Sequence, residues 1–318
     1  MARQWLRKVS MIVGNNQGQG RELSGLAINF HVRHSIIETP NTLVARIFNL
    51  SPTTRNQIVN EFTRVILQAG YAGNFGRIFQ GEIKQIFRGR ESAVDDYVDI
   101  YAADGDTAHN WATLNRTLAA GHTASDVYDS VSDSMKPFQV QPGEKPAELK
   151  NAPQAPRARV LFGMTREEAR TLAQSYGLNW YLENGTLQFL TQSAYKPGDV
   201  AIISDQTGMV GVPEQTMDGI AVTVLLNPSI GSGSLIEIRP SAGQDFAVAG
   251  YQRSGPIGLN YTSVDIPPSI DAHGRYKVLF ADHIGETRGT AWYTRITCIS
   301  TDPTAIQPTT RSVIGATG

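Results

Sequence analysis

Several groups of residues have types and spacings that could support catalysis or metal binding. His31 and His34 are spaced like a pair of metal ligands, but residues of opposite parity in a strand point to opposite faces, so their rings cannot share one ion unaided. Ser232 stands between two glycines, in a motif shorter than the five-residue nucleophile elbow, and it falls between two predicted strands instead of before a helix. Structural roles explain these three residues better than catalysis.

Two pairs of adjacent acids could suggest the paired carboxylates of a glycosidase. Asp95 and Asp96 would diverge in a strand, and Glu167 and Glu168 fall in the first turn of a predicted helix, where acids favour the helix dipole. The glycine-rich stretch 14–20 lacks the spacing of a dinucleotide-binding motif and the lysine of a P-loop, so we expect a hairpin loop there. The sequence thus predicts no enzyme, with no catalytic, cofactor-binding or metal-binding residues.

Length and composition indicate a globular protein with more than one domain. The chain has 318 residues, of which 41% are hydrophobic and 18% charged, enough for a sizeable core in two or three domains. The single cysteine, Cys298, excludes an intrachain disulfide and a cysteine-based zinc cluster. Arg3, Arg7 and Lys8 follow the first residue without an apolar run, so we expect neither a signal peptide nor a membrane span.

The net charge of -1 hides two blocks of opposite sign. Residues 1–90 hold 12 basic and 4 acidic side chains, whereas residues 91–135 hold 1 basic and 9 acidic ones. A basic block alone would suggest phosphate binding. Because an equal acidic block follows directly, we expect the two to neutralise each other within or between subunits.

The first third of the sequence has the pattern of a β module with one inserted helix. Leu26, Ile28, Phe30 and Val32 alternate with smaller or polar residues, which is the period of a half-buried strand. Ser51 followed by a proline predicts a capped helix over 52–62. Further strands are expected at 42–50, 65–69, 77–88 and 94–103.

The middle of the sequence predicts helices, a linker and a hairpin. A capping-box pattern at 123–126 opens a helix of about 12 residues, and a second capping box at 165–168 opens another. Prolines at 137, 142, 146, 153 and 156 lie among polar residues, so the segment 137–156 is expected to be an extended, mobile linker near the outside. Asn184-Gly185 predicts a tight hairpin turn between strands.

The last third again predicts strands rich in β-branched and aromatic residues. They are expected at 201–204, 220–226, 234–239, 276–283 and 291–299. A second β module is therefore expected. The polar end, 303–318, carries no periodicity and is expected to be a loose tail.

Motifs in both halves of the sequence resemble baseplate hub proteins of tailed bacteriophages. In the first half the resemblance is carried by TPNTLVARIFNLSP at 39–52, VILQAGY at 65–71 and IFQGEI at 78–83. In the second half it is carried by GVPEQTMDGI at 211–220, LLNP at 225–228 and YKVLFADHIGETRGTAWY at 276–293. The resemblance spans most of the chain except the proline-rich segment.

The resemblance implies a mainly β (α+β) fold with two tail-tube-like β-barrel modules of the same topology and a small α/β middle region. The expected domains are an N-terminal module at 1–105, a middle region at 106–195 containing the linker 137–156, a C-terminal module at 196–302, and the tail at 303–318.

The resemblance also implies a structural function in the virion. Three subunits would close a ring of six similar barrels that joins the sixfold tail tube to the threefold central spike and surrounds the DNA channel. The implied partners are further copies of the chain as a homotrimer, the tail-tube protein, the spike protein, baseplate wedge or other baseplate proteins, and DNA in transit without sequence-specific binding. A contractile tail assembled in the host bacterial cytoplasm is the expected setting. The alternatives are a distal tail or tube-initiator ring protein, a baseplate-associated lytic enzyme, and a soluble binding module.

The charge reversal falls within one predicted hairpin. If strands 78–88 and 94–103 pair so that residue numbers sum to about 183, Lys84 faces Asp99 and Arg88 faces Asp95. These pairs would favour one register over another, at about 0.2 to 1 kcal/mol each. The competing interpretation directs the basic side chains to a partner subunit or to DNA in the channel.

Overall fold

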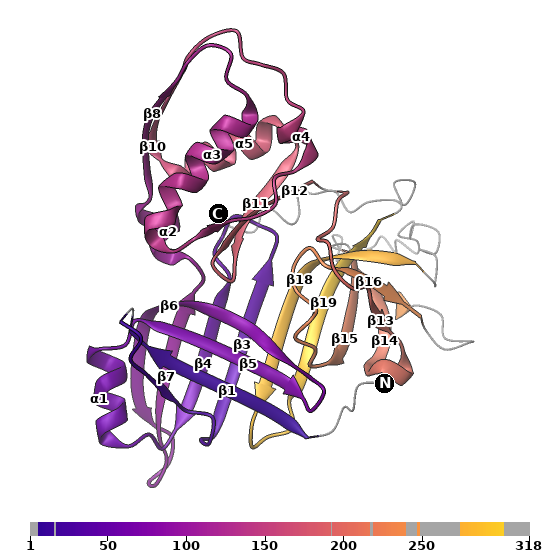
Figure 1. Cartoon of the computed structure of the whole chain (residues 1–318). Coiled ribbons are helices and arrows are strands. Elements are labelled where there is room, and N and C mark those ends of the chain that lie inside the picture. Colours follow the sequence, from indigo (N-terminus) through magenta and orange to yellow (C-terminus); the bar gives the residue numbers. More distant parts are fainter. Residues whose placement is uncertain are drawn as a thin grey trace, which may run out of the picture.

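The computed structural model describes residues 6–15, 17–191, 193–216, 219–239, 247–248 and 274–301, and this part of the chain is mainly β. Most strands belong to one large sheet with the order β17-β14-β15-β19-β18-β3-β4-β7-β6-β5-β1-β2, to which β16 and β13 attach beside β18. The middle of the chain forms a separate lobe at one end of this sheet (Figure 1). None of the described helices is long and apolar enough to cross a membrane.

The N-terminal module folds the sheet over itself around one core. Strand β6 is long: its first half pairs with β5 and its second half with β7, so β1 and β5 cross in front of β4 and β7 (Figure 1). The space between these layers is filled by inward-facing side chains such as Met11, Phe30 and Leu67. The elements are β1 (Arg7–Gly14), β2 (Gly20–Glu22), β3 (Ile28–Ser35), β4 (Thr42–Phe48), α1 (Pro52–Asn60), β5 (Arg64–Tyr71), β6 (Asn74–Arg90) and β7 (Asp96–Ala103).

Two local predictions for this module are confirmed. The Ser51 Oγ accepts a hydrogen bond from the Thr54 N–H at 3.2 Å and caps α1, whose first residue is Pro52. The glycine-rich stretch 14–20 joins β1 to β2 as an antiparallel hairpin.

The middle lobe has its own core between two helices and two small sheets. Helices α3 and α5 pack against each other and against β8 and β11, and bury side chains such as Val131, Leu161 and Leu172. The elements are α2 (Asp106–Trp111), β8 (Thr113–Leu118), α3 (Ala124–Met135), η1 (Lys136–Phe138), β9 (Gln141–Pro142), α4 (Ala147–Lys150), β10 (Arg159–Met164), α5 (Thr165–Ser175), β11 (Leu178–Glu183) and β12 (Thr186–Thr191).

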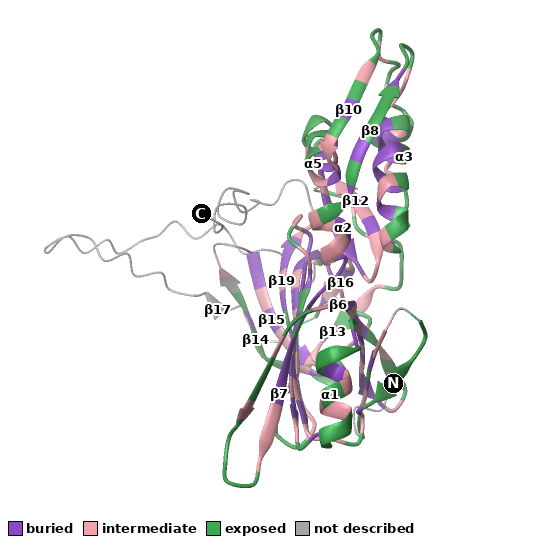
Figure 2. Cartoon of the chain, turned by 90° about the vertical axis from the view of Figure 1, so that its left-hand side faces the viewer, coloured by how far each residue is buried: buried purple, intermediate pink, exposed green. Residues whose placement is uncertain are grey.

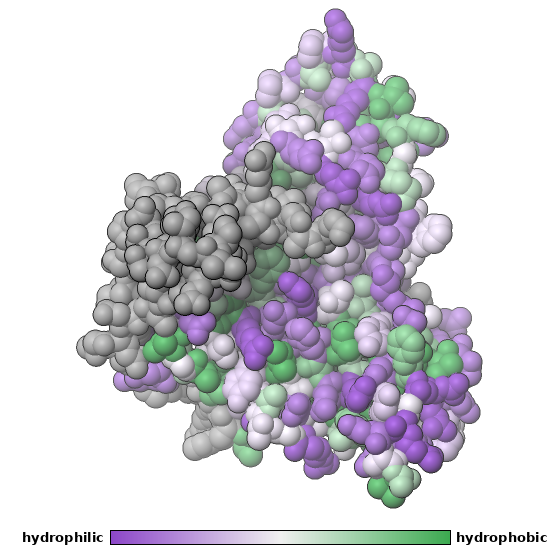
Figure 3. Space-filling model, turned by 180° about the vertical axis from the view of Figure 1, so that it is seen from behind, coloured by the Kyte–Doolittle hydropathy of each residue, from purple (hydrophilic) through white to green (hydrophobic). Residues whose placement is uncertain are grey.

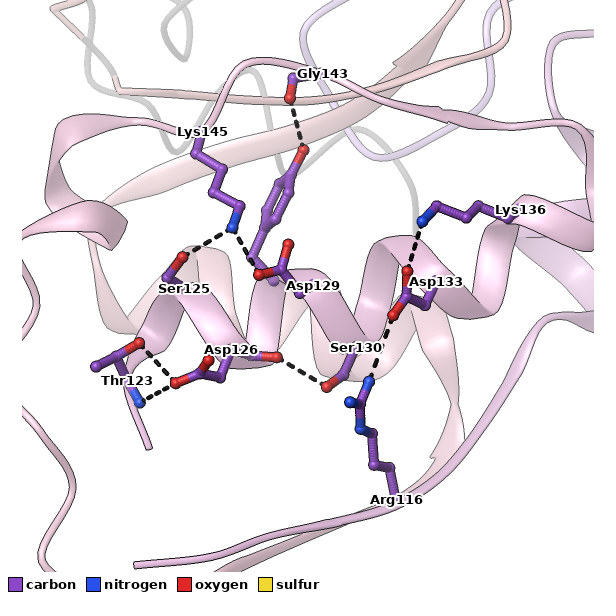
Figure 4. Close-up of polar contacts among 11 residues, drawn as sticks. Arg116, Thr123, Ser125, Asp126, Asp129, Ser130, Asp133, Lys136, Gly143 and Lys145 are labelled. Carbon is purple, nitrogen blue, oxygen red and sulfur yellow. Dashed lines mark hydrogen bonds and ion pairs between the residues drawn. The ribbon is translucent and has the colours of Figure 1, made fainter. Parts of the chain in front are cut away.

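The segment 137–156 lies near the outside, as predicted, and most of its residues are exposed, but it is not an extended linker, because it is packed against the lobe. Strand β9 pairs with β12, and α4 buries Leu149 completely. The Tyr128 hydroxyl donates to the Gly143 carbonyl at 2.9 Å, and the Lys145 ammonium lies 2.7 Å from the Asp129 carboxylate (Figure 4). Single apolar residues spaced between the prolines are sufficient to anchor the segment.

Of the two predicted capping boxes, only the first forms. The Asp126 carboxylate accepts hydrogen bonds from the backbone N–H and the hydroxyl of Thr123 at the start of α3 (Figure 4). Helix α5 begins one residue earlier than the second box requires, so Thr165 is its first helical residue and not its cap. The hairpin turn is confirmed, since Asn184 and Gly185 have φ of 51° and 74°, the left-handed pair typical of a type I′ turn.

The C-terminal module contains the predicted strands and, among the described residues, two that the sequence did not reveal, β14 and β17. Its core contains Ile220, Tyr276 and Ile296 among others, and Figure 2 shows buried residues along β15 and β19. The elements are β13 (Ala201–Ile203), η2 (Asp205–Thr207), β14 (Met209–Thr216), β15 (Gly219–Leu225), β16 (Leu235–Ile238), β17 (Ala247–Val248), β18 (Arg275–Glu286) and β19 (Trp292–Ser300). The tail predicted at 303–318 lies outside the described residues.

The two modules share one strand order. In the N-terminal module the order β3-β4-β7-β6-β5-β1 matches β14-β15-β19-β18-β16-β13 in the C-terminal module, and the matching strands follow each other in the same sequence. The long strand of each module carries a bulge against its neighbour, at Lys84 in β6 and at Leu279 in β18. One difference is that β1 runs antiparallel to β5, whereas β13 runs parallel to β16.

The predicted mainly β (α+β) fold is confirmed, but the barrel form of its two tube-like modules requires a correction. Among the described residues neither module closes on itself, because β3 of the first module pairs with β18 of the second and the sheet continues through both. The modules are therefore open, curved halves of one larger sheet.

Candidate assembly edges and uncovered sheet face

The junction between the modules is a strand-to-strand pairing. Strand β18 pairs with β16 through residues 275–277 and then with β3 through residues 280–286, antiparallel, from Phe280 opposite Ser35 to Glu286 opposite Asn29. Beyond the ladder, the Thr287 hydroxyl accepts the Ile28 N–H at 2.8 Å. The N-terminal module thus pairs its edge strand, β3, with the part of β18 that β16 leaves open.

This pairing produces an arc of neighbouring strands, β14-β15-β19-β18-β3-β4-β7-β6, with an open edge at each end. Within the described residues, β6 beyond Ile83 has no partner strand on the side away from β7. At the opposite end, the outer side of β14 pairs with the two residues of β17 and with no other strand in the described part of the chain. The two edges lie at opposite sides of the sheet (Figure 1).

Both open edges expose apolar side chains. The exposed fraction is 47% for Phe87 on β6, and 41% and 40% for Val210 and Val212 on β14. Strand edges with exposed apolar residues are templates for pairing with another chain, and proteins normally cover or charge them. These two edges are our candidate assembly sites.

The face of the arc turned away from the cores carries charges of both signs. Arg46 on β4 donates two hydrogen bonds to Asp99 on β7, at 2.8 and 2.9 Å, and these bonds are the main cause that raises the pKa of Arg46. Asp282 on β18 lies in register between Arg33 and Arg295. Seen from behind, the lower part of the molecule mixes hydrophilic and hydrophobic side chains (Figure 3). We call the face of the arc that is turned away from the cores the uncovered face.

The four predicted charge-pair residues are not brought together as expected. Lys84 lies 2.8 Å from Asp106 of α2, and Asp99 is held by Arg46. Asp95 accepts hydrogen bonds from Asn49 and Ser92, which lower its pKa. Arg88 is exposed and forms no ion pair within the described residues.

The reason is the register of the β6–β7 hairpin. The ladder places Phe87 opposite Asp99 and Arg88 opposite Val98, which is three residues from the predicted register. Strand β6 continues through Gly89 and Arg90, so the turn is centred later than predicted, and Lys84 is the bulge residue. Because the register differs by an odd number of residues, each side chain lies on the opposite face of the sheet from the partner predicted for it.

The other residues singled out by chemistry have structural partners. His31 and His34 lie on opposite faces as predicted: His31 is exposed, 3.0 Å from Asp282, whereas His34 is buried and its Nε2 donates to the Ile78 carbonyl at 2.6 Å. Ser232 is fully buried in the loop between β15 and β16. The acid pairs are divided among partners, since Asp96 binds Arg90, Glu167 binds Arg170, and Glu168 binds Arg159.

A buried polar junction between the three cores was not anticipated. The rings of His34 and His283 meet edge to face, with centroids 5.5 Å apart. Burial is the first cause that lowers the pKa of each, to about 3 for His283. The Glu183 carboxylate lies 3.4 Å from the Nδ1 of His34, but a neutral ring makes this a close polar contact and not an ion pair. His34 continues the inward parity of Ile28 and Val32, which is the signal that could have predicted its burial.

Around the two histidines the junction holds both acids and bases. The Asp104 carboxylate accepts the Gly185 N–H at 3.0 Å, and burial raises its pKa to about 6. Lys196 contacts Glu183, while burial lowers the pKa of Lys196 to about 8. These contacts attach the β11–β12 hairpin of the middle lobe to both modules.

Comparisons with known proteins give consistent results. A family model described as baseplate hub gp41 matches residues 6–251. The fold is similar to the 43 kDa tail protein of prophage MuSo2 from Shewanella oneidensis (TM-score 0.57, 10% identity, covering 95% of this chain and 99% of that one) and to a tail protein from Neisseria meningitidis MC58 (TM-score 0.59, 11% identity, covering 93% and 98%).

A third similar structure is the E. coli c3393 protein, described as a component of the type VI secretion system that is structurally similar to the T4 tail proteins gp27 and gp5 (TM-score 0.52, 10% identity, covering 89% of this chain and 76% of that one). No curated protein sequence matches significantly.

Proposed function

Because the chain belongs to the baseplate hub gp41 family of phage tail proteins, we propose that it is a structural hub subunit that assembles as a ring of three. In this role the ring joins a sixfold tail tube to a threefold central spike and surrounds the channel through which DNA leaves the tail. The protein acts by assembly and not by catalysis.

The observation that carries the proposal is the repeated strand order within one chain. Two modules of the same topology are joined edge to edge through β18 and β3, so three chains contain six similar modules. A ring of three such chains has true threefold symmetry and an approximate sixfold repeat of modules. Covalent duplication therefore suits a subunit that must contact a sixfold partner on one side and a threefold partner on the other.

The proposed domain organisation follows the same division. Residues 1–105 and 196–302 supply the ring modules, and residues 106–195 form the lobe between them in sequence. We assign the tail-tube and spike proteins to the two faces of the ring, and wedge or other baseplate proteins to its outside. The setting that we propose is a contractile tail assembled in the host cytoplasm.

The uncovered face suits a channel wall. Some of its positive charges lie beside carboxylates: Arg46 pairs with Asp99, and Asp282 lies in register between Arg33 and Arg295 and 3.0 Å from His31. A strongly basic wall would retain phosphates through counterion release, whereas a neutralised wall lets DNA pass without sequence-specific binding.

The test is the mass of the purified full-length chain in solution, measured by sedimentation equilibrium over a range of concentrations. Three copies per particle, with ring-shaped particles in electron micrographs, are expected. Six copies would favour a distal tail or tube-initiator ring, and a monomer that clears peptidoglycan would favour a lytic enzyme; either result overturns the hub proposal.

A further inference from the structure

We infer that a groove in the middle lobe binds an extended segment of a partner polypeptide in which a carboxylate lies beside an apolar side chain. The groove lies where α3 begins and α5 ends, and the stretch 153–159 forms its other side. It is separate from both open sheet edges and from the uncovered face. The inference therefore goes beyond the proposed ring and does not depend on the number of subunits.

The groove is large enough for a ligand and has an apolar floor. Its volume is about 390 Å³, within the ~300–1,000 Å³ typical of ligand sites. Val127 of α3 and Leu172 of α5 line it and are nearly fully buried in the core of the lobe. An apolar side chain of a ligand would lose contact with water on this floor, which favours binding.

The stretch 153–159 is fixed against the lobe. The Ala155 N–H donates a hydrogen bond to the His122 carbonyl at 2.7 Å, and prolines on both sides of Ala155 restrict the backbone. At the end of the stretch, the Arg159 guanidinium lies 2.7 Å from the Glu168 carboxylate of α5. The groove is thus formed before a ligand arrives, which lowers the entropic cost of binding.

The charge of the groove favours an anionic ligand. The described residues that line it include three basic side chains, His122, Arg157 and Arg159, and no carboxylate. Two acids beside the groove are already engaged, since Glu168 binds Arg159 and Asp126 caps the start of α3 (Figure 4). The uncompensated positive charge is therefore that of Arg157 and not that of the helix N-terminus.

Three polar groups of the groove have no hydrogen-bond or ion-pair partner in the part of the chain that the structure describes. They are the Arg157 guanidinium, the Tyr176 hydroxyl and the Nε2 of His122. The Nδ1 of His122 donates to the Ala119 carbonyl at 2.8 Å, so Nε2 is the nitrogen left for a ligand. An arginine side chain can bind a carboxylate through two parallel hydrogen bonds, which makes a carboxylate the preferred anion.

A polypeptide segment suits this groove better than an enclosed small molecule. The rim is exposed at Pro153, Pro156 and Arg157, so a ligand longer than the groove can continue beyond it. The described part of the chain has a segment of matching chemistry at the tip of the β6–β7 hairpin, where Val94 is 81% exposed between two acids. That tip lies at the end of the molecule opposite the lobe (Figure 2), so a chain cannot fill its own groove. The occupant that we assign is another protein.

The test begins with a random heptapeptide library selected by mRNA display on the immobilised full-length chain. Enriched peptides should carry aspartate or glutamate next to leucine, isoleucine or phenylalanine. Fluorescence anisotropy then compares each enriched peptide with its amide isostere, in which asparagine or glutamine replaces the acid. The isostere and the variant Arg157→Glu should each weaken binding by about tenfold or more. The matched variant Arg88→Glu, at an exposed arginine of β6, should bind like the wild type.

A second variant tests the apolar part of the groove without changing its charge. Ala155 lines the groove, so Ala155→Trp should fill it and weaken binding by about tenfold or more. The control Ala158→Trp changes an exposed residue that does not line the groove and should bind like the wild type. Urea unfolding of each variant shows whether its fold is intact.

Four results would overturn the inference. The first is no enrichment above that obtained with Arg157→Glu, and the second is enriched peptides that lack an acid or bind both groove variants like the wild type. The third is displacement by N-acetyl-leucine as effective as by the unlabelled peptide, which would assign the groove to a small carboxylate. The fourth is tighter binding of a peptide that copies residues 91–96, which would assign it to a second copy of this chain. All four leave the proposed ring untouched.

Discussion

The buried ring of His283 makes the folded chain sensitive to acid. The Thr294 hydroxyl lies 2.9 Å from the His283 Nδ1 and also accepts the Asn227 N–H at 3.1 Å, so we assign the hydroxyl as donor to an unprotonated Nδ1. Burial first, and the neighbouring His34 second, lower the pKa of His283 to about 3. Protonation would place a charge in the core and remove the acceptor that the hydroxyl needs.

The size of the effect follows from proton linkage. An exposed histidine in the unfolded chain has a pKa of about 6.5, so between pH 6.5 and 3 the unfolded state binds a proton that the folded state does not. The free energy of unfolding therefore falls as the pH is lowered through this window, by about 1.4 kcal/mol per unit. At pH 5 the loss due to His283 is about 2 kcal/mol. His34 shifts stability in the same direction, and Asp104 in the opposite direction.

The substitution His283→Gln isolates this contribution because glutamine can donate and accept hydrogen bonds but does not titrate. Urea unfolding at pH 7.5 and pH 5.0, at one fixed protein concentration, gives the stability lost on acidification. The variant should lose about 2 kcal/mol less than the wild type over this interval. His122→Gln, in the middle lobe and away from the junction, should lose as much as the wild type. Equal losses in His283→Gln and the wild type would refute the assignment of a neutral buried ring.

Three further predictions use the same unfolding assay. Burial raises the pKa of Asp104 to about 6, so the contribution of this carboxyl group to stability is present below pH 4 and lost as the pH rises through 6. The variant Asp104→Asn should therefore be more stable than the wild type at pH 7.5, by up to about 3 kcal/mol. No gain in stability at that pH would contradict the prediction. Replacing Arg46 and Asp99 by alanine, singly and together, should give a coupling energy of about 1 kcal/mol, and additive effects would show that the pair is energetically silent. Gly70→Ala should cost about 2 to 4 kcal/mol, because φ is 151° and a Cβ would meet a carbonyl oxygen at 2.1 Å, whereas the control Gly25→Ala, with open space around it, should change stability by less than about 0.5 kcal/mol.

Features determined by neighbouring residues were predictable from the sequence. The inward parity of 26–32 and the turn at Asn184-Gly185 appear in the structure as predicted, because strand period and turn type depend on a few adjacent side chains. The cap at Ser51 is local in the same way. Such features need no knowledge of the partner strand.

Features determined by contacts between distant segments were not predictable. The register of the β6–β7 hairpin depends on the bulge at Lys84, whose side chain is drawn to Asp106 beyond the end of β7. The segment 137–156 is held by Leu149 in the core of the lobe and by contacts to α3 that composition cannot show. The polar junction likewise combines distant residues, since its members His34, Asp104, Glu183 and His283 are each at least 70 positions apart in the sequence.

The strand order that the two modules share has a small counterpart in the sequence, which becomes visible only with the topology known. After β4 and β15, which are equivalent strands, the chain reads Leu-Ser-Pro at 50–52 and Leu-Asn-Pro at 226–228, and both leucines are buried. Ser51 and Asn227 each accept a backbone N–H two or three residues later, so the same corner is built by two different side chains.

A serine and an asparagine can serve at equivalent corners because each module requires apolar side chains that point inward and a hydrogen-bonding residue before the proline. Neither requirement fixes the residue type. The same tolerance explains how structures with 10 to 11% identity keep this fold over nearly their whole length. The junction between the modules is under a stricter requirement, because β18 must change partners from β16 to β3 along its length and keep a defined register with both. A bulge against the neighbouring strand, at Leu279 in β18 and at Lys84 in β6, is a local feature that both long strands share.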